Sequence, residues 1–144
     1  MFELYFTNSF VSIYYDKANR LGKAVWRGHV SGAEFRETVL LCQNLMDRYE
    51  LEGWLGDNRK MDAIEPADLK WSMEVLLPHL IAGSMLRMAN LPSEREENRK
   101  ALEVMLEKKH ELDQKLLIRD FECEQEAMAW LLELTEEKSS PVGS

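Results

Sequence analysis

The chain has 144 residues and a mass of 16.8 kDa, which suits one domain and leaves no room for a second hydrophobic core. Its composition is 45% hydrophobic, enough to fill a core, so disorder of the whole chain is excluded. Eighteen basic against 26 acidic residues give a net charge of −8, the wrong sign for binding nucleic acid or anionic membranes.

The N-terminus and the cysteines indicate compartment and chemistry. No basic, apolar leader opens the chain, and no run approaches the roughly 18 apolar residues of a membrane span. We therefore expect a cytoplasmic protein without stable membrane insertion. Cys42 and Cys123 lie far apart, and neither they nor the three histidines have metal-ligand spacing. We expect no disulfide, no metal and no cofactor.

Short strands fill the first part of the chain. Residues 3–6, 10–15 and 23–26 are rich in aromatic and β-branched residues and are separated by turn-forming residues, which is typical of an antiparallel meander. The next segment, from about residue 32 to 50, predicts a helix because its apolar residues recur at intervals of three and four. Ser31 and Glu34 at its start have the spacing of a capping box.

Strands and helices alternate over the rest of the chain. Residues 53–56 predict a buried strand that ends in the polar segment 57–60. The later expected elements are a helix from Pro66 to Gly83 with a kink at Pro78, a strand over 85–91, a charged helix opened by a capping box at Ser93 and Glu96, a strand over 116–118 and a last helix through Leu134. Residues 135–144 predict a disordered tail, so the single domain spans residues 1–134.

This alternation determines the expected fold class. Strands joined through helices imply parallel crossovers, whereas the N-terminal meander adds antiparallel strands. The sequence predicts an α/β domain with a mixed sheet of about five to six strands, flanked by about four helices.

Several short segments resemble the SpoIIAA-like family. They are the meander end at residues 24–28, the helix start at 30–35, the strand exit at 57–61 and the closing stretch at 121–131. This family is related to STAS domains, the anti-sigma-factor antagonist modules, and its fold is compared with that of CRAL-TRIO lipid-binding domains. The resemblance covers about residues 3–134 and implies a STAS-like binding or regulatory module.

One property of STAS antagonists has no counterpart in this sequence. In the phosphorylation-controlled members, a Ser or Thr follows an Asp in a strand-to-helix loop, where the next helix N-terminus can help hold a phosphate. Here Asp57 is followed by Asn, Arg, Lys and Met, and neither Ser nor Thr occurs between Trp54 and Trp71. The sequence therefore predicts a module without this phosphoacceptor.

The polar segment after the buried strand is the candidate binding site. In open α/β sheets, ligands collect beyond the carboxyl ends of the strands. Here that end carries Asp57, Asn58, Arg59, Lys60 and Met61. The adjacent cations form a positive spot able to receive a carboxylate or phosphate group. Alternatively, the first two residues cap a turn and the two cations are solvated.

The first functional hypothesis is a non-catalytic regulatory module that binds a protein partner through the 57–65 loop and the following helix. Arg59 and Lys60 would supply rim charge, and Met61, Ile64 and Trp71 would supply apolar contacts. The sequence does not identify the partner, and it is also compatible with a homodimer.

The alternative is a carrier or sensor of an amphipathic or lipid-like small molecule. Large apolar residues on the helix after Pro66, with Met85 and Met88 on the next strand, would surround an acyl chain, with Arg59 or Lys60 at its head group. Ordinary core packing accounts for the same apolar residues. No GxSxG, P-loop or GxGxxG motif occurs, so we expect no enzymatic activity and assign no catalytic residue.

Overall fold

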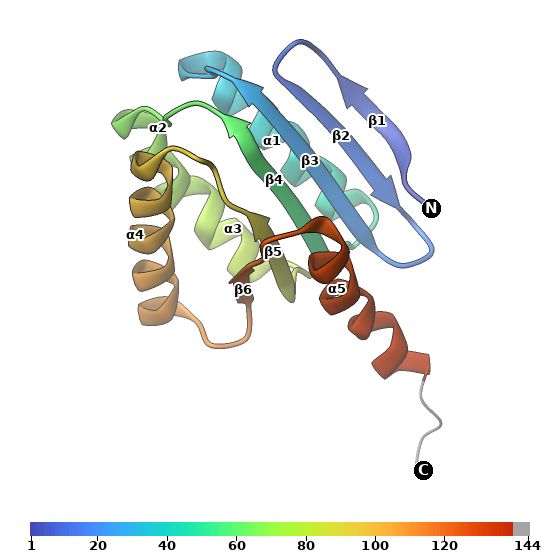
Figure 1. Ribbon diagram of the computed structural model, residues 1–144. Helices are drawn as coiled ribbons and strands as arrows, with labels where there is room; N and C mark the ends of the chain where they lie inside the picture. Colours follow the sequence, from blue (N-terminus) through green and yellow to red (C-terminus); the bar gives the residue numbers. More distant parts are fainter. Residues whose placement is uncertain (140–144) are drawn as a thin grey trace.

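The computed structural model describes residues 1–139, which form a six-stranded sheet in the order β1-β2-β3-β4-β5-β6 (Figure 1). The strands are β1 (Glu3–Thr7), β2 (Val11–Asp16), β3 (Leu21–Gly28), β4 (Gly53–Met61), β5 (Arg87–Leu91) and β6 (Leu117–Asp120). Pairing is antiparallel from β1 to β3 and parallel from β3 to β6. The predicted mixed α/β sheet with an N-terminal meander is confirmed.

Helices cover the two faces of this sheet unequally. The helical elements are α1 (Gly32–Arg48), α2 (Pro66–Trp71), the π-helical turn η1 (Ser72–Leu76), α3 (Leu77–Ala82), α4 (Glu96–Leu112) and α5 (Glu124–Ser139). The crossover helices α1, α2 to α3, and α4 share one face, and α5 lies on the other (Figure 1). Because α2, η1 and α3 follow one another without a break, they form one long helix.

Each face carries its own apolar core. The face covered by the crossover helices, called the helix-covered face below, packs residues such as Ile13, Phe35 and Trp54. The opposite face packs Leu55 and Leu131, with further residues of β3, β5 and α5. Burial on both faces explains why the parallel strands lack a simple alternation of apolar and polar residues.

The start of α1 is stabilised by a distant residue rather than by its own first turn. Ser31 is the N-cap, but its side chain makes no capping hydrogen bond. Instead the carboxylate of Asp68, from α2, accepts a hydrogen bond from the Gly32 N–H at 3.0 Å and one from Arg36 Nε at 3.4 Å. Asp68 is only 1% exposed, and its charge complements the positive end of the helix dipole. The predicted capping box of Ser31 and Glu34 is therefore wrong.

Two helices depart from their predicted shape. The irregular turn lies at η1, immediately before Pro78 rather than at it, where a proline without an N–H interrupts the regular hydrogen-bond ladder. The last helix, α5, continues to Ser139, beyond the end expected at Leu134. The added turn consists of good helix formers such as Glu and Lys. The rest of the expected tail, residues 140–144, lies outside the described residues.

Replacing Asp68 with Ala should lower the free energy of unfolding by about 1–3 kcal/mol, because the Gly32 N–H and the Arg36 guanidinium lose their buried acceptor. Urea unfolding followed by circular dichroism measures this loss. Ser31→Ala is the matched control and should change stability by less than about 0.5 kcal/mol. Equal losses in the two variants would contradict the assignment of Asp68 as the cap.

Candidate functional site

Strand β4 continues through the segment predicted as a polar loop. Asp57 pairs with Val25 of β3 on one side and with Leu91 of β5 on the other. The pairing with β3 continues as far as Met61. The expectation that the strand ends at Gly56 and gives way to a polar loop at residues 57–60 is wrong, because pairing with β3 takes up backbone hydrogen bonds of this segment.

Asp57 and Arg59 form an ion pair within this strand. The Asp57 carboxylate accepts hydrogen bonds from Arg59 Nε at 2.9 Å and from a terminal guanidinium nitrogen at 2.8 Å. Burial alone would raise the pKa of Asp57. The hydrogen bonds from the Arg59 side chain and backbone, with the positive charges of Arg59 and Lys23, outweigh burial and lower that pKa. Arg59 is thus already paired with an anion of its own strand, which opposes the head-group role predicted for it.

A β-bulge decides which side chains of β4 turn toward the crossover helices. Val25 and Arg27 of β3 pair with Asp57 and Lys60, so β4 holds one more residue than β3 over this stretch. The extra residue shifts the alternation of side chains, and Met61 rather than Lys60 follows Asn58 on the helix-covered face. Met61 is buried and Lys60 is exposed.

A cavity of about 210 Å³ lies between this face of the sheet and the crossover helices. For comparison, an apolar cavity of about 150 Å³ is large enough to hold benzene. Its apolar walls come from the sheet, α1, the long helix and α4. Among the lining residues are Trp26, Trp54, Met88 and Ile118 of the sheet, Phe35, Val39, Cys42 and Met46 of α1, Leu76, Leu77 and Leu80 of the long helix, and Leu102 and Met105 of α4.

Gly56 leaves the sheet side of this cavity open. A Cβ atom built at this residue would approach no nearer than 3.9 Å to the Ala89 carbonyl oxygen and to Asn90 Oδ1. A methyl group at residue 56 would therefore make ordinary contacts, two of them with the side chains of Asn58 and Asn90, and would clash with nothing, although β4 is a central strand.

A chain of polar side chains crosses the sheet beside this opening. Asn58 Nδ2 donates to Asn90 Oδ1 at 2.6 Å, and Asn90 Nδ2 donates to Asp120 Oδ1 at 3.0 Å. The three residues belong to β4, β5 and β6, near the carboxyl ends of these parallel strands. Sequence reasoning selected Asn58 but missed Asn90 and Asp120. The same rule for strand ends, applied to the predicted strands 85–91 and 116–118, would have found them.

A second cavity, of about 120 Å³, leads from this polar chain toward the start of α4. Asn58 and Asn90 line both cavities, whereas Asp120 and Arg99 line only this outer one. The residues common to the two cavities are Asn58, Met61, Ile64, Asn90, Leu102 and Met105. The two cavities are therefore adjoining parts of one site, with the polar chain at their boundary.

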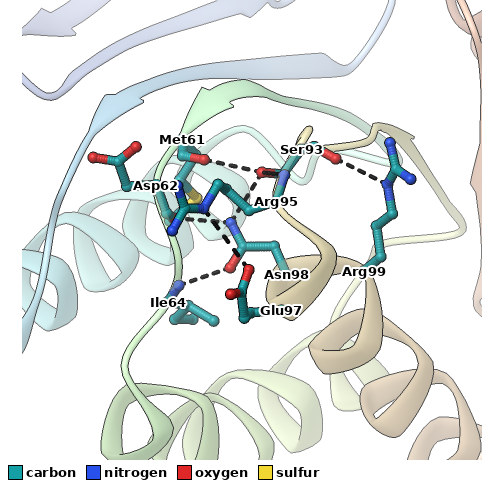
Figure 2. A network of polar contacts seen from close by, with 8 residues as sticks. All are labelled: Met61, Asp62, Ile64, Ser93, Arg95, Glu97, Asn98 and Arg99. Atoms are coloured by element: carbon teal, nitrogen blue, oxygen red, sulfur yellow. Dashed lines mark hydrogen bonds and ion pairs between the residues drawn. The ribbon is translucent and has the colours of Figure 1, made fainter.

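Figure 2 shows the polar contacts that join the end of β4 to the start of α4, beside the outer cavity. Ser93 Oγ donates to the Met61 carbonyl oxygen at 2.9 Å and accepts hydrogen bonds from the Arg95 N–H and from Asn98 Nδ2. Asn98 Nδ2 also donates to the Asp62 carbonyl oxygen. These contacts replace the predicted capping box at Ser93 and Glu96, since α4 begins after an Arg95 N-cap without a side-chain cap.

The remaining predicted residues lie in different places. Ile64 lines both cavities, and its N–H donates to Asn98 Oδ1 at 2.7 Å. Trp71 lies between α2 and α1, edge-on to Phe35 and under the Arg36 guanidinium. Of the predicted set, the structure gathers Asn58, Met61 and Ile64 at the cavity, whereas Asp57, Arg59, Lys60 and Trp71 do not line it.

Within residues 1–139, no group of three or more His, Cys, Asp or Glu side chains is arranged to hold a metal ion. In the same part of the chain, no helix combines the length and the apolar character needed to cross a membrane.

Comparison with known proteins gives matches among solved structures alone. No family model matches the chain, and no curated protein matches it. A solved structure is similar over 91% of this chain and 92% of its own, with 16% identity and a TM-score of 0.47. It is described as an uncharacterized protein from the DUF3478 family with a SpoIIAA-like fold, from Shewanella loihica PV-4. Its description names the fold of the family that the sequence resembles.

Arg59→Met removes the partner of the buried Asp57 carboxylate and should lower the free energy of unfolding at neutral pH by about 1 kcal/mol, a modest value because the guanidinium is half exposed. The pair holds the folded-state pKa of Asp57 below its unfolded value. Its stabilisation is therefore present above the unfolded pKa and is lost as pH falls through the folded one.

The difference between wild type and Arg59→Met should accordingly shrink as the pH falls from 7 to below about 3. Urea unfolding at several pH values measures it. Lys60→Met is the matched control, because Lys60 is an exposed neighbour of the same charge. A loss in Arg59→Met that stays constant with pH would contradict the ion-pair assignment.

Proposed function

We propose that this protein binds a small amphipathic molecule in the cavity between the sheet and its crossover helices, as a carrier or sensor. The observation that supports this function is a cavity with apolar walls, a glycine without a side chain at residue 56 of its sheet wall, and hydrogen-bonded polar side chains at one end. Ligand sites of this kind are mostly apolar, with a few polar groups that fix the orientation of the ligand.

The apolar walls suit a hydrocarbon part of limited length. Side chains of four separate structural elements line the space, so a ligand there would contact the protein on several sides. Burial of each methylene contributes about 0.8 kcal/mol. Met46, Met61, Met88 and Met105 are among the lining residues, and their unbranched thioether side chains adjust readily to different ligand shapes.

The polar groups of the inner cavity are concentrated at Asn58 and Asn90. Ser72 also lines the space, but its hydroxyl group donates to the Asp68 carbonyl oxygen at 2.9 Å. Because unpaired polar groups are costly to bury, a ligand gains by placing its polar end at the two amides and its hydrocarbon part between α1 and α3.

Cys42 lines this cavity, and its buried position opposes covalent chemistry at the thiol. The side chain is buried on α1, and burial raises its pKa to about 12. The thiol thus stays protonated at neutral pH, whereas the thiolate is the nucleophile. Neither Cys42 nor the amides form a nucleophile and base pair of the kind that covalent catalysis needs.

A protein partner at the 57–65 segment has less support. Arg59 is paired with Asp57, Met61 is buried, and Trp71 packs against α1 rather than standing beside these residues. The rim charge and the apolar contacts predicted from the sequence therefore do not form one surface.

Binding of straight-chain primary alcohols, from butanol to dodecanol, tests the proposal. Affinity should rise about fourfold per added methylene while the hydrocarbon part is being buried, and should stop rising once the cavity is full. Quenching or shift of tryptophan fluorescence reports binding, because Trp26 and Trp54 line the cavity. Absence of saturable binding by any alcohol would contradict the proposed function.

Substitutions at Gly56 localise this binding. Gly56→Leu places a large side chain at the sheet wall of the cavity and should weaken binding of the longer alcohols about tenfold or more. Gly56→Ala is the matched control and should retain binding within about twofold, since a Cβ there meets only ordinary contacts. Circular dichroism and urea unfolding confirm that both variants fold. Equal binding by wild type and a folded Gly56→Leu would place the alcohol elsewhere.

A further inference from the structure

The hydrogen bonds that cross the sheet also determine which polar group of a ligand can pair with Asn58. Asp120, at the end of β6, accepts from Asn90 Nδ2, and Asn90 Oδ1 accepts from Asn58 Nδ2. As a carboxylate, Asp120 has only acceptor oxygens. It can pair with Asn90 only if the NH₂ group of that amide faces it.

The orientation of Asn90 in turn fixes the orientation of Asn58. With its NH₂ group turned to Asp120, Asn90 presents its oxygen to Asn58, and Asn58 must in turn direct its own NH₂ group toward Asn90. The orientation of both amides is therefore fixed by one charge at the outer end, rather than by the amides themselves.

The consequence is that Asn58 Oδ1, at the inner end of these three hydrogen-bonded side chains, is left as an unused acceptor. Among residues 1–139, no side chain or backbone group donates to Asn58 Oδ1, and Asn58 lines both cavities. Its NH₂ group lies 4.0 Å from the position that a Cβ of residue 56 would occupy. Asn58 thus lies beside residue 56 in the cavity wall, with its NH₂ group nearest to that residue.

We infer that the ligand carries a neutral hydrogen-bond donor, a hydroxyl group of an alcohol or phenol, which donates to Asn58 Oδ1. This inference rests on the proposed function and specifies the chemistry of its ligand. A hydroxyl group also accepts, so it can use an amide N–H that the chain leaves unpaired. A carboxylate cannot donate, and it would approach a chain that ends in the Asp120 anion.

Arg99 does not reverse this preference. It lines only the outer cavity, and its Nε donates to the Ser93 carbonyl oxygen at 3.1 Å. The described side chains that line the inner cavity carry no formal charge. A buried anionic head group there would lose its water without gaining a cation.

Two neutral probes of equal carbon number test the inference. We would titrate the whole protein with n-octanol and with methyl hexyl ketone, which accepts hydrogen bonds but cannot donate them. Tryptophan fluorescence gives both dissociation constants. Wild type should bind the alcohol about three- to tenfold more tightly, the range expected for one hydrogen bond. Equal or tighter binding of the ketone would overturn the inference and leave the proposed function intact, whereas failure of both probes to bind would overturn both.

Asp120→Asn tests whether the acceptor-only carboxylate at residue 120, and not any polar side chain there, fixes the orientation of the two amides. The substituted side chain has an NH₂ group as well as an oxygen, so the amide chain could run in either direction and Asn58 could present its NH₂ group to the ligand. The preference for the alcohol should fall to about twofold or less, through tighter binding of the ketone. Glu103→Gln removes an exposed charge of α4 and should keep the full preference. An undiminished preference in Asp120→Asn would overturn the role of Asp120.

Asn58→Leu provides a second variant with a side chain of similar size. It should still bind both probes, because the apolar walls remain, but it should no longer distinguish them by more than about twofold. Retention of the wild-type preference in this variant would overturn the assignment of Asn58 as the acceptor.

Discussion

The central position of β4 constrains the rest of this protein. The strand is paired with β3 on one side and β5 on the other over most of its length. Its backbone is therefore held in place by hydrogen bonds from both sides. Which of its side chains face the crossover helices is then settled by alternation and by the bulge opposite Val25 and Arg27. The bulge places Met61 at the cavity and leaves Lys60 exposed.

Small and polar residues on this strand explain why a space remains above it. Trp54 fills its part of the layer by lying over Gly22 of β3, where any Cβ would overlap the ring. Two residues further on, Gly56 contributes nothing to the layer. Asn58 is then bonded sideways to Asn90 rather than filling the gap. A ligand in this space would contact the side chains that line it.

The polar chain and the network at the start of α4 have different roles. Ser93 and Asn98 hold the end of β4 to α4 through backbone carbonyl and N–H groups, and so fix the shape of the outer cavity (Figure 2). The chain from Asn58 to Asp120 uses side chains alone. It can therefore direct its hydrogen-bonding groups toward a ligand without disturbing the sheet.

The sequence by itself determined the class of fold, the meander, and the order of strands and helices, because hydrophobic period is a local property. It also selected Asn58, Met61 and Ile64, which line the cavity. Only the tertiary structure decided that residues 57–61 are strand, that Arg59 is paired with Asp57, and that Asp68 caps α1. It also decided the partners of Asn58. Each of these depends on contacts between residues distant in sequence or on a bulge in strand pairing, which no local pattern records.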